Sequence, residues 1–178
     1  FGVGYEITIA RPSVTVNVIP QIILGNFEGG ACAAGLPPDN GGMDRNQLHV
    51  GDCVPHMANW AADHPGSVDL AFADPPFNIG YNYDQYKDRK KRGEYLDWVA
   101  VWLACIDACL SPVGSVYVAI GDEYAAEMKV RMDARGWHMR NWVVWAYTFG
   151  MNCTNKFARS HTHVLYYVRN PDAFTFNG

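Results

Sequence analysis

One short segment of the sequence contains residue types that could do chemistry: Asp74-Pro75-Pro76-Phe77, directly after the apolar stretch at residues 68–73. A carboxylate and a backbone carbonyl both accept hydrogen bonds, so Asp74 and the carbonyl of Pro75 could hold the two N–H bonds of one amine. Proline fixes φ and lacks an N–H donor, which holds that carbonyl in place before a substrate arrives. Phe77 adds a flat apolar face.

This combination suits an exocyclic amine of a nucleobase. The lone pair of such an amine is delocalised into the ring, which makes the nitrogen a weak nucleophile. Two acceptors on its N–H bonds draw the nitrogen toward tetrahedral geometry and free the lone pair to attack a methyl sulfonium. An aromatic face holds a base taken out of its stack, and such stacking is worth about 1–3 kcal/mol. The alternative interpretation is a strand-terminating turn that Asp74 caps and the prolines stiffen.

Two groups of basic residues could contact phosphates. The first closely follows residues 74–77, and the second precedes the last predicted strand. The net charge of −4 does not decide against such contacts, because phosphates respond to nearby cations more than to the global sum. The alternative is a solvated surface run. The predicted phosphate contacts are Lys87, Arg89, Lys90, Lys91, Arg92, Lys156 and Arg159.

No metal site is predicted. The five cysteines are odd in number and form no CxxC pair, which disfavours both a zinc site and a disulfide framework. His161 and His163 alternate at the start of the last predicted strand, and we expect their side chains on opposite faces, where they could not share a metal ion.

The elements that must position these residues alternate in type. Strands are predicted at 47–50, 68–73, 115–120, 137–147 and 162–168, and helices at 54–63, 93–110 and 123–135, with a turn at 111–114. Strands alternating with helices predict an α/β sheet that is parallel or mostly parallel. Ligands bind such sheets at the carboxyl ends of the strands, where residues 74–77 lie.

The bulk properties predict one globular domain. The chain has 178 residues, of which 49% are hydrophobic and 18% charged, enough for a single buried core. No apolar run approaches the roughly 18 residues of a membrane span, and no signal peptide is recognisable at the amino terminus. We therefore expect a cytoplasmic protein without a membrane partner.

Residues 1–42 differ from the rest of the sequence in composition and pattern. A Val/Ile-rich stretch gives way there to a run of glycine and proline, whereas the patterned part of the sequence begins at Met43. We predict that residues 1–42 are an irregular extension or non-family segment, and that residues 43–178 form the catalytic part.

Four ordered blocks resemble the amino-terminal half of the beta-class DNA amino-methyltransferases, which modify adenine N6 or cytosine N4. They are QLHVGDC (47–53), VDLAFADPPFNIG (68–80), LSPVGSV (110–116) and NKFARSHTHVLYY (155–167), and together they cover roughly Met43 to the end. Four ordered blocks are far more specific than one tetrapeptide. The resemblance implies a Rossmann-like class I methyltransferase sheet, S-adenosylmethionine as methyl donor and site-specific methylation of double-stranded DNA.

By the same resemblance, Asp74, Pro75, Pro76 and Phe77 form the catalytic tetrad, and Asp52, Cys53 and Asp74 lie near the cofactor. A strand-end turn with a buried thiol is the alternative for Asp52 and Cys53. In the family an aspartate at position 74 goes with adenine and a serine more often with cytosine N4, so we expect adenine N6 and keep cytosine N4 as the alternative. A homodimer and a companion restriction endonuclease are left open.

The glycine-rich FxGxG loop that binds the methyl donor in this family, nearer the carboxyl terminus, has no match in residues 43–178. Phe1-Gly2-Val3-Gly4 resembles it superficially but lacks a preceding strand. We therefore expect an incomplete sheet and a truncated enzyme. The alternatives are a non-catalytic DNA-binding remnant of the same fold, or another Rossmann-like methyltransferase that acts on RNA or on a protein glutamine amide.

Overall fold

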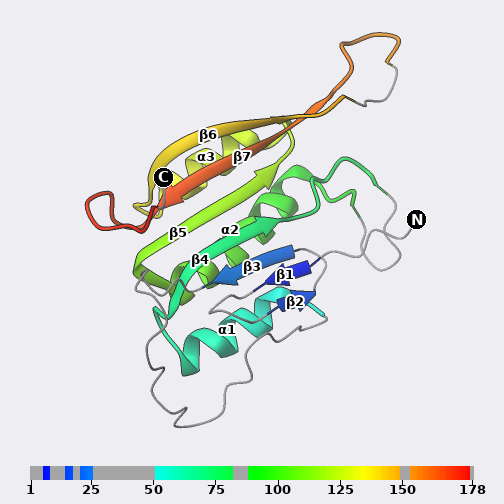
Figure 1. Ribbon diagram of the computed structural model, residues 1–178. Coiled ribbons are helices and arrows are strands. Elements are labelled where there is room, and N and C mark those ends of the chain that lie inside the picture. The colour runs from blue at the N-terminus through cyan, green and yellow to red at the C-terminus, as the bar shows by residue number, and fades with distance from the viewer. Residues whose placement is uncertain are drawn as a thin grey trace.

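The computed structural model describes residues 6–8, 15–17, 21–25, 51–81, 88–148 and 153–176. A sheet with the strand order β3-β4-β5-β7-β6 runs through the molecule (Figure 1). Its strands are β3 (Gln21–Gly25), β4 (Val68–Asp74), β5 (Leu110–Ile120), β6 (His138–Ala146) and β7 (His161–Val168). Two further strands, β1 (Glu6–Thr8) and β2 (Thr15–Asn17), pair antiparallel with each other.

The sheet is mixed, so the prediction of a mostly parallel sheet is wrong. Only β4 and β5 run parallel among the strands described, and the helix α2 (Arg92–Cys109) lies between them in the chain. The pairs β3–β4, β5–β7 and β6–β7 are antiparallel. A parallel pair needs a crossover connection, which α2 supplies, whereas antiparallel strands such as β6 and β7 can be neighbours without one.

The predicted helices are confirmed with shifts of one or two residues at their ends: α1 spans Cys53–Asp63, α2 spans Arg92–Cys109 and α3 spans Ala125–Asp133. The strands predicted at 68–73, 137–147 and 162–168 are also confirmed. The strand predicted at 47–50 lies outside the described residues, as does most of the region 1–42. Within that region β3 pairs with β4 from Gln21, opposite Asp74, to Gly25, opposite Leu70.

The turn predicted at residues 111–114 is wrong, because β5 already begins at Leu110. Val68 pairs with Leu110 while Leu70 pairs with Ser115, so a bulge in β5 takes up these residues within the ladder. The Ser111 hydroxyl donates a hydrogen bond to the Asp69 carboxylate at 2.7 Å. The proline and glycine therefore mark an irregularity inside a strand rather than its beginning.

One hydrophobic core joins the helices to the sheet. α2 contributes its largest buried side chains, α3 contributes two methionines, and the strands contribute mostly small or β-branched residues. None of the described helices is long and apolar enough to cross a bilayer. The main core side chains are Tyr95, Val99, Trp102, Leu103 and Ile106 of α2, Met128 and Met132 of α3, and Val68, Ala71, Ala73, Val116, Val118, Ile120, Leu165 and Tyr167 of the sheet.

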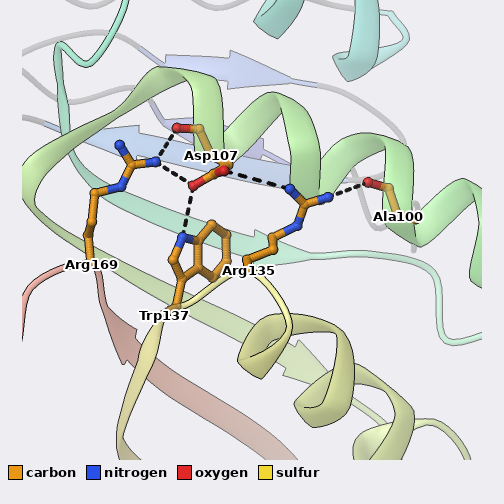
Figure 2. Close-up of polar contacts among 5 residues, drawn as sticks. All are labelled: Ala100, Asp107, Arg135, Trp137 and Arg169. Atoms are coloured by element: carbon orange, nitrogen blue, oxygen red, sulfur yellow. Dashed lines mark hydrogen bonds and ion pairs between the residues drawn. The ribbon is translucent and has the colours of Figure 1, made fainter.

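Asp107 on α2 joins three parts of the fold (Figure 2). Its carboxylate accepts a hydrogen bond from the buried Trp137 indole at 2.9 Å and pairs with the guanidinium of Arg169, which follows β7. The Arg135 guanidinium lies 3.8 Å from the same carboxylate and donates to the Ala100 carbonyl at 2.8 Å. One partly buried carboxylate thus ties α2 to the chain before β6 and after β7.

We expect Asp107→Ala to lower the free energy of unfolding by about 1–3 kcal/mol, because it leaves the buried indole N–H without its acceptor. Urea denaturation followed by tryptophan fluorescence measures the change. Asp97→Ala, at an exposed position on the same helix, is the matched control and should change stability by less than about 0.5 kcal/mol. Equal stabilities for the two variants would contradict the assigned role of Asp107.

Candidate active site

Asp74 is the last residue of β4 and lies at the C-terminal end of the parallel strand pair. Pro75 and Pro76 follow it, both buried, and the pairing of β4 with β5 stops there because proline has no N–H to donate. Burial raises the pKa of the Asp74 carboxyl to about 6 from an ordinary value of 3.8. A carboxyl with such a pKa is ionised at neutral pH yet basic enough to take a proton.

The backbone after Asp74 is fixed by a hydrogen bond to α2. The Tyr95 hydroxyl, fully buried, donates to the Pro76 carbonyl at 2.8 Å. The Tyr95 ring lies 4.5 Å from that of Tyr124, centroid to centroid. Because the ring of Pro76 fixes its φ and each peptide unit is planar, anchoring the Pro76 carbonyl also limits how the neighbouring Pro75 carbonyl can turn.

Phe77 is half-buried and lies against Gly121, the residue that follows β5. A Cβ atom at position 121 would come within 3.3 Å of Phe77 Cδ2, so the glycine permits this close approach. Asn78 follows with φ of 57°, a left-handed conformation that asparagine tolerates better than most residues. Its side-chain amide donates to the Lys90 carbonyl at 3.0 Å and to the Tyr124 hydroxyl at 2.9 Å.

Sequence reasoning missed the buried polar residues around this segment. Asp88, which is 2% exposed, accepts hydrogen bonds from the backbone of residues 78–81. Tyr95 and Tyr124 were read only as parts of helices. The available signal was the NIG turn at 78–80 followed by an aspartate within the basic run at 87–92, and that pattern alone does not say which groups the carboxylate meets.

The two predicted cofactor residues next to α1 have different environments. Asp52 is exposed and caps the helix, accepting the Val54 N–H at 3.0 Å. Cys53 is 1% exposed, and burial raises the pKa of its thiol to about 12. The Cys53 side chain therefore packs in the core, and only its backbone could meet a ligand.

Two of the predicted phosphate contacts pair with carboxylates of the protein. Arg92 pairs with Glu127 and lies 5.2 Å from the centre of the Tyr124 ring, and Arg159 pairs with Glu123 at 2.6 and 2.8 Å. Arg159 also reaches the Asp122 carboxylate at 3.0 Å. The Arg89, Lys91 and Lys156 residues are exposed, Lys90 is partly buried, and Lys87 lies outside the described residues.

His161 and His163 share a face of β7, which overturns the expectation that they point apart. Their ring centroids lie 4.9 Å from each other. Successive residues of a strand alternate faces, so residues two apart return to the same side. The Trp142 indole on β6 donates to Nδ1 of His163 at 3.0 Å, and burial lowers the pKa of His163.

Solved structures share this arrangement of strands and helices. The PvuII DNA methyltransferase, described as cytosine-N4-specific, superposes with a TM-score of 0.56 at 17% identity, covering 70% of this chain and 49% of its own. A Thermus thermophilus protein, described as a putative DNA modification methylase and complexed with S-adenosyl-L-methionine, gives 0.52 at 18% identity, covering 74% and 57%. The fold is thus that of DNA methyltransferases, as the sequence predicted.

The chain belongs to the N6/N4-type DNA methylase family, whose model matches residues 68–178. The type II methyltransferase M.HpaI of Haemophilus parainfluenzae is 31% identical over 112 residues, 62% of this chain and 36% of the relative. M.BamHI of Bacillus amyloliquefaciens is 32% identical over 138 residues, covering 75% and 31%. The DNA adenine methyltransferase YhdJ of Escherichia coli is 27% identical over 145 residues, covering 81% and 48%. The chain therefore spans about a third to a half of these relatives.

The buried state of Asp74 predicts a pH-dependent stability. Its folded-state pKa of about 6 lies above the unfolded value of 3.8, so its contribution to stability is fully present below about pH 4 and is lost as the pH rises through 6. We expect Asp74→Asn, which cannot ionise, to be more stable than the native protein by about 1–3 kcal/mol at pH 8, with little difference at pH 4. Urea denaturation at both pH values measures this, and a variant less stable at pH 8 would contradict it.

Proposed function

We propose that this protein takes part in methylating DNA on an exocyclic amine, with adenine N6 as the acceptor and S-adenosylmethionine as the methyl donor. The observation that carries the proposal is the half-buried Asp74 carboxylate with its two rigid prolines and Phe77 at a strand end, in a chain of the DNA methylase family. In this role residues 74–77, which we call the acceptor segment, hold the target base.

The acceptor segment would work by orienting the amine. Asp74 accepts one N–H and the Pro75 carbonyl the other, while Phe77 stacks on the ring of a base drawn out of the helix. When bound, S-adenosylmethionine supplies an electrophilic methyl group on a sulfonium. Transfer would break the methyl–sulfur bond as the N–C bond forms, with the sulfur leaving as a neutral thioether. The methylated nitrogen would then lose one proton, which Asp74, with its pKa near 6, can receive.

Two carboxylates could interact with the positive charge of the methyl donor. S-adenosylmethionine carries a sulfonium, and in this proposal Asp52, which caps α1, and Asp74, which ends β4, supply negative charge to it. Cys53 could contribute only its backbone. Support for the donor itself comes from the family and from the Thermus thermophilus structure that contains it.

Adenine is the proposed acceptor because position 74 is an aspartate and because YhdJ, the relative matched over the largest share of this chain among those named above, is a DNA adenine methyltransferase. Cytosine N4 is the second candidate. It is favoured by the fold-level likeness to the cytosine-N4-specific PvuII enzyme. Both amines present two N–H bonds and a planar ring, so the acceptor segment could hold either.

Double-stranded DNA would reach the site past Arg89, Lys91 and Lys156, whose exposed side chains can neutralise phosphates. Arg92 and Arg159 would contact DNA only by exchanging their carboxylate partners. We also propose residues 43–178 as the amino-terminal part of a catalytic domain. A companion restriction endonuclease accords with the type II names of two relatives.

The test is transfer of labelled methyl groups from S-adenosylmethionine to DNA. Asp74→Ala should reduce the rate by about 10²- to 10⁴-fold, because it removes the carboxylate that orients the amine and takes its proton. Asp97→Ala serves as the folded control. Mass spectrometry of digested DNA should give N6-methyladenine, whereas N4-methylcytosine would establish the second candidate.

Undiminished transfer by Asp74→Ala would refute the acceptor role. Calorimetric titration of the native protein with S-adenosylmethionine tests the donor site separately. Heat of binding is expected, and its absence would favour the non-catalytic remnant.

A further inference from the structure

We propose that Asp88 is a positioning residue whose carboxylate holds the acceptor segment and the first arginine of the basic run in one rigid unit. This inference rests on the function proposed above and adds a residue that acts through others.

The carboxylate of Asp88 is surrounded by backbone donors. Oδ1 accepts the N–H of Asn78 at 2.8 Å, and Oδ2 accepts those of Ile79 at 3.1 Å, Gly80 at 3.0 Å and Tyr81 at 2.9 Å. The Asp88 carbonyl also accepts the Gly80 N–H, at 2.7 Å. Consecutive N–H groups that converge on one anion form a nest, and charge-assisted bonds of this kind are roughly twice as strong as neutral ones.

The nest begins one residue after the acceptor segment. Asn78, whose N–H binds Asp88, also joins the Tyr124 hydroxyl and the Lys90 carbonyl through its side-chain amide, and its Oδ1 accepts the Lys90 N–H at 2.7 Å. Tyr95, whose ring contacts that of Tyr124, holds the Pro76 carbonyl on the other side of Phe77. These contacts hold the backbone on both sides of Phe77, and Asp88 supplies the charge on the Asn78 side.

The same nest places Arg89. A Cβ atom at Gly80 would collide with the Arg89 guanidinium, and Gly80 has φ of +85°. The left-handed backbone favours glycine there, and the missing Cβ leaves room for the guanidinium to lie against it. Arg89 is exposed and directly follows Asp88 in sequence, so the carboxylate that anchors the turn also sets the position of the first arginine proposed to contact phosphate.

An aspartate is suited to this position because its two oxygens have lone pairs for all the converging N–H groups. An asparagine of the same shape has one oxygen and an NH₂ group that would face backbone donors. At 2% exposure the site gives water little access to replace the lost bonds. Asp88→Asn is therefore a nearly isosteric change that should loosen the turn.

The experiment compares steady-state methyl transfer to DNA by the native protein, Asp88→Asn and Tyr95→Phe, each well below its unfolding temperature. Asp88→Asn should lower kcat by about 10- to 100-fold and also raise KM for DNA, because both the acceptor segment and Arg89 lose their anchor. Tyr95→Phe, which removes only the bond to the Pro76 carbonyl, should lower kcat and leave KM for DNA unchanged.

Amide hydrogen exchange at residues 79–81 reports on the nest independently, and Asp88→Asn should lose protection there. Asp97→Asn is the control and should match the native protein in rate and exchange.

Lost protection with unchanged kcat and KM would show that Asp88 only stabilises the turn and would overturn the proposal. Retained protection in Asp88→Asn would overturn it as well. If the native protein itself transfers no methyl group, the proposed function fails and the positioning role fails with it. That result differs from the other two because it does not depend on any variant.

Discussion

The parallel pairing of β4 with β5 is the constraint from which the rest of the structure follows. Two neighbouring strands that run the same way need a connection crossing from one end of the sheet to the other, and α2 provides it. The crossover covers one face of the sheet with buried aromatic and aliphatic side chains. It also brings the carboxyl ends of both strands to one edge, so that Phe77 meets Gly121 and Tyr95 meets Tyr124.

Three aspartates in this fold illustrate different uses of a carboxylate. Asp107 accepts an indole N–H and pairs with guanidinium groups, and Asp88 is enclosed by backbone N–H groups. Both repay part of the desolvation of a buried charge with hydrogen bonds. Asp74 differs, because burial dominates its pKa. Burial disfavours its ionised form, which suits the proposed role of binding a substrate amine and receiving a proton.

Tertiary contacts give neighbouring basic residues different partners. In sequence, residues 89–92 are four adjacent cations. In the fold Arg92 pairs with Glu127 on α3, while Arg89 stands over Gly80 beside the nest. Arg159, from the connection before β7, pairs with two carboxylates that follow β5. Pairs of this kind at the surface contribute little to stability but hold their side chains in defined positions. The cations at residues 89–92 therefore occupy distinct environments, although in the sequence they form one uninterrupted run of positive charge.

The sequence by itself determined the features that depend on local chemistry and on spacing along the chain. Apolar periodicity located α2, an apolar run located β4, a β-branched run located the main part of β5, and the two prolines marked where β4 must end with Asp74. These are short-range effects, and each can be derived from neighbouring residues. The family resemblance added the assignment of the acceptor segment.

Only the tertiary structure decided which distant groups meet. Asp88 reaches a turn 7 to 10 residues earlier, Tyr95 finds a carbonyl 19 residues away, and Asp107 joins Arg169 across 62. The antiparallel direction of β7 likewise could not be predicted from the sequence, because strand direction depends on how a connection crosses the sheet and not on the composition of the strand. Burial is also a tertiary property, and it alone raises the pKa of Asp74, since the same aspartate in an extended chain would be surrounded by water.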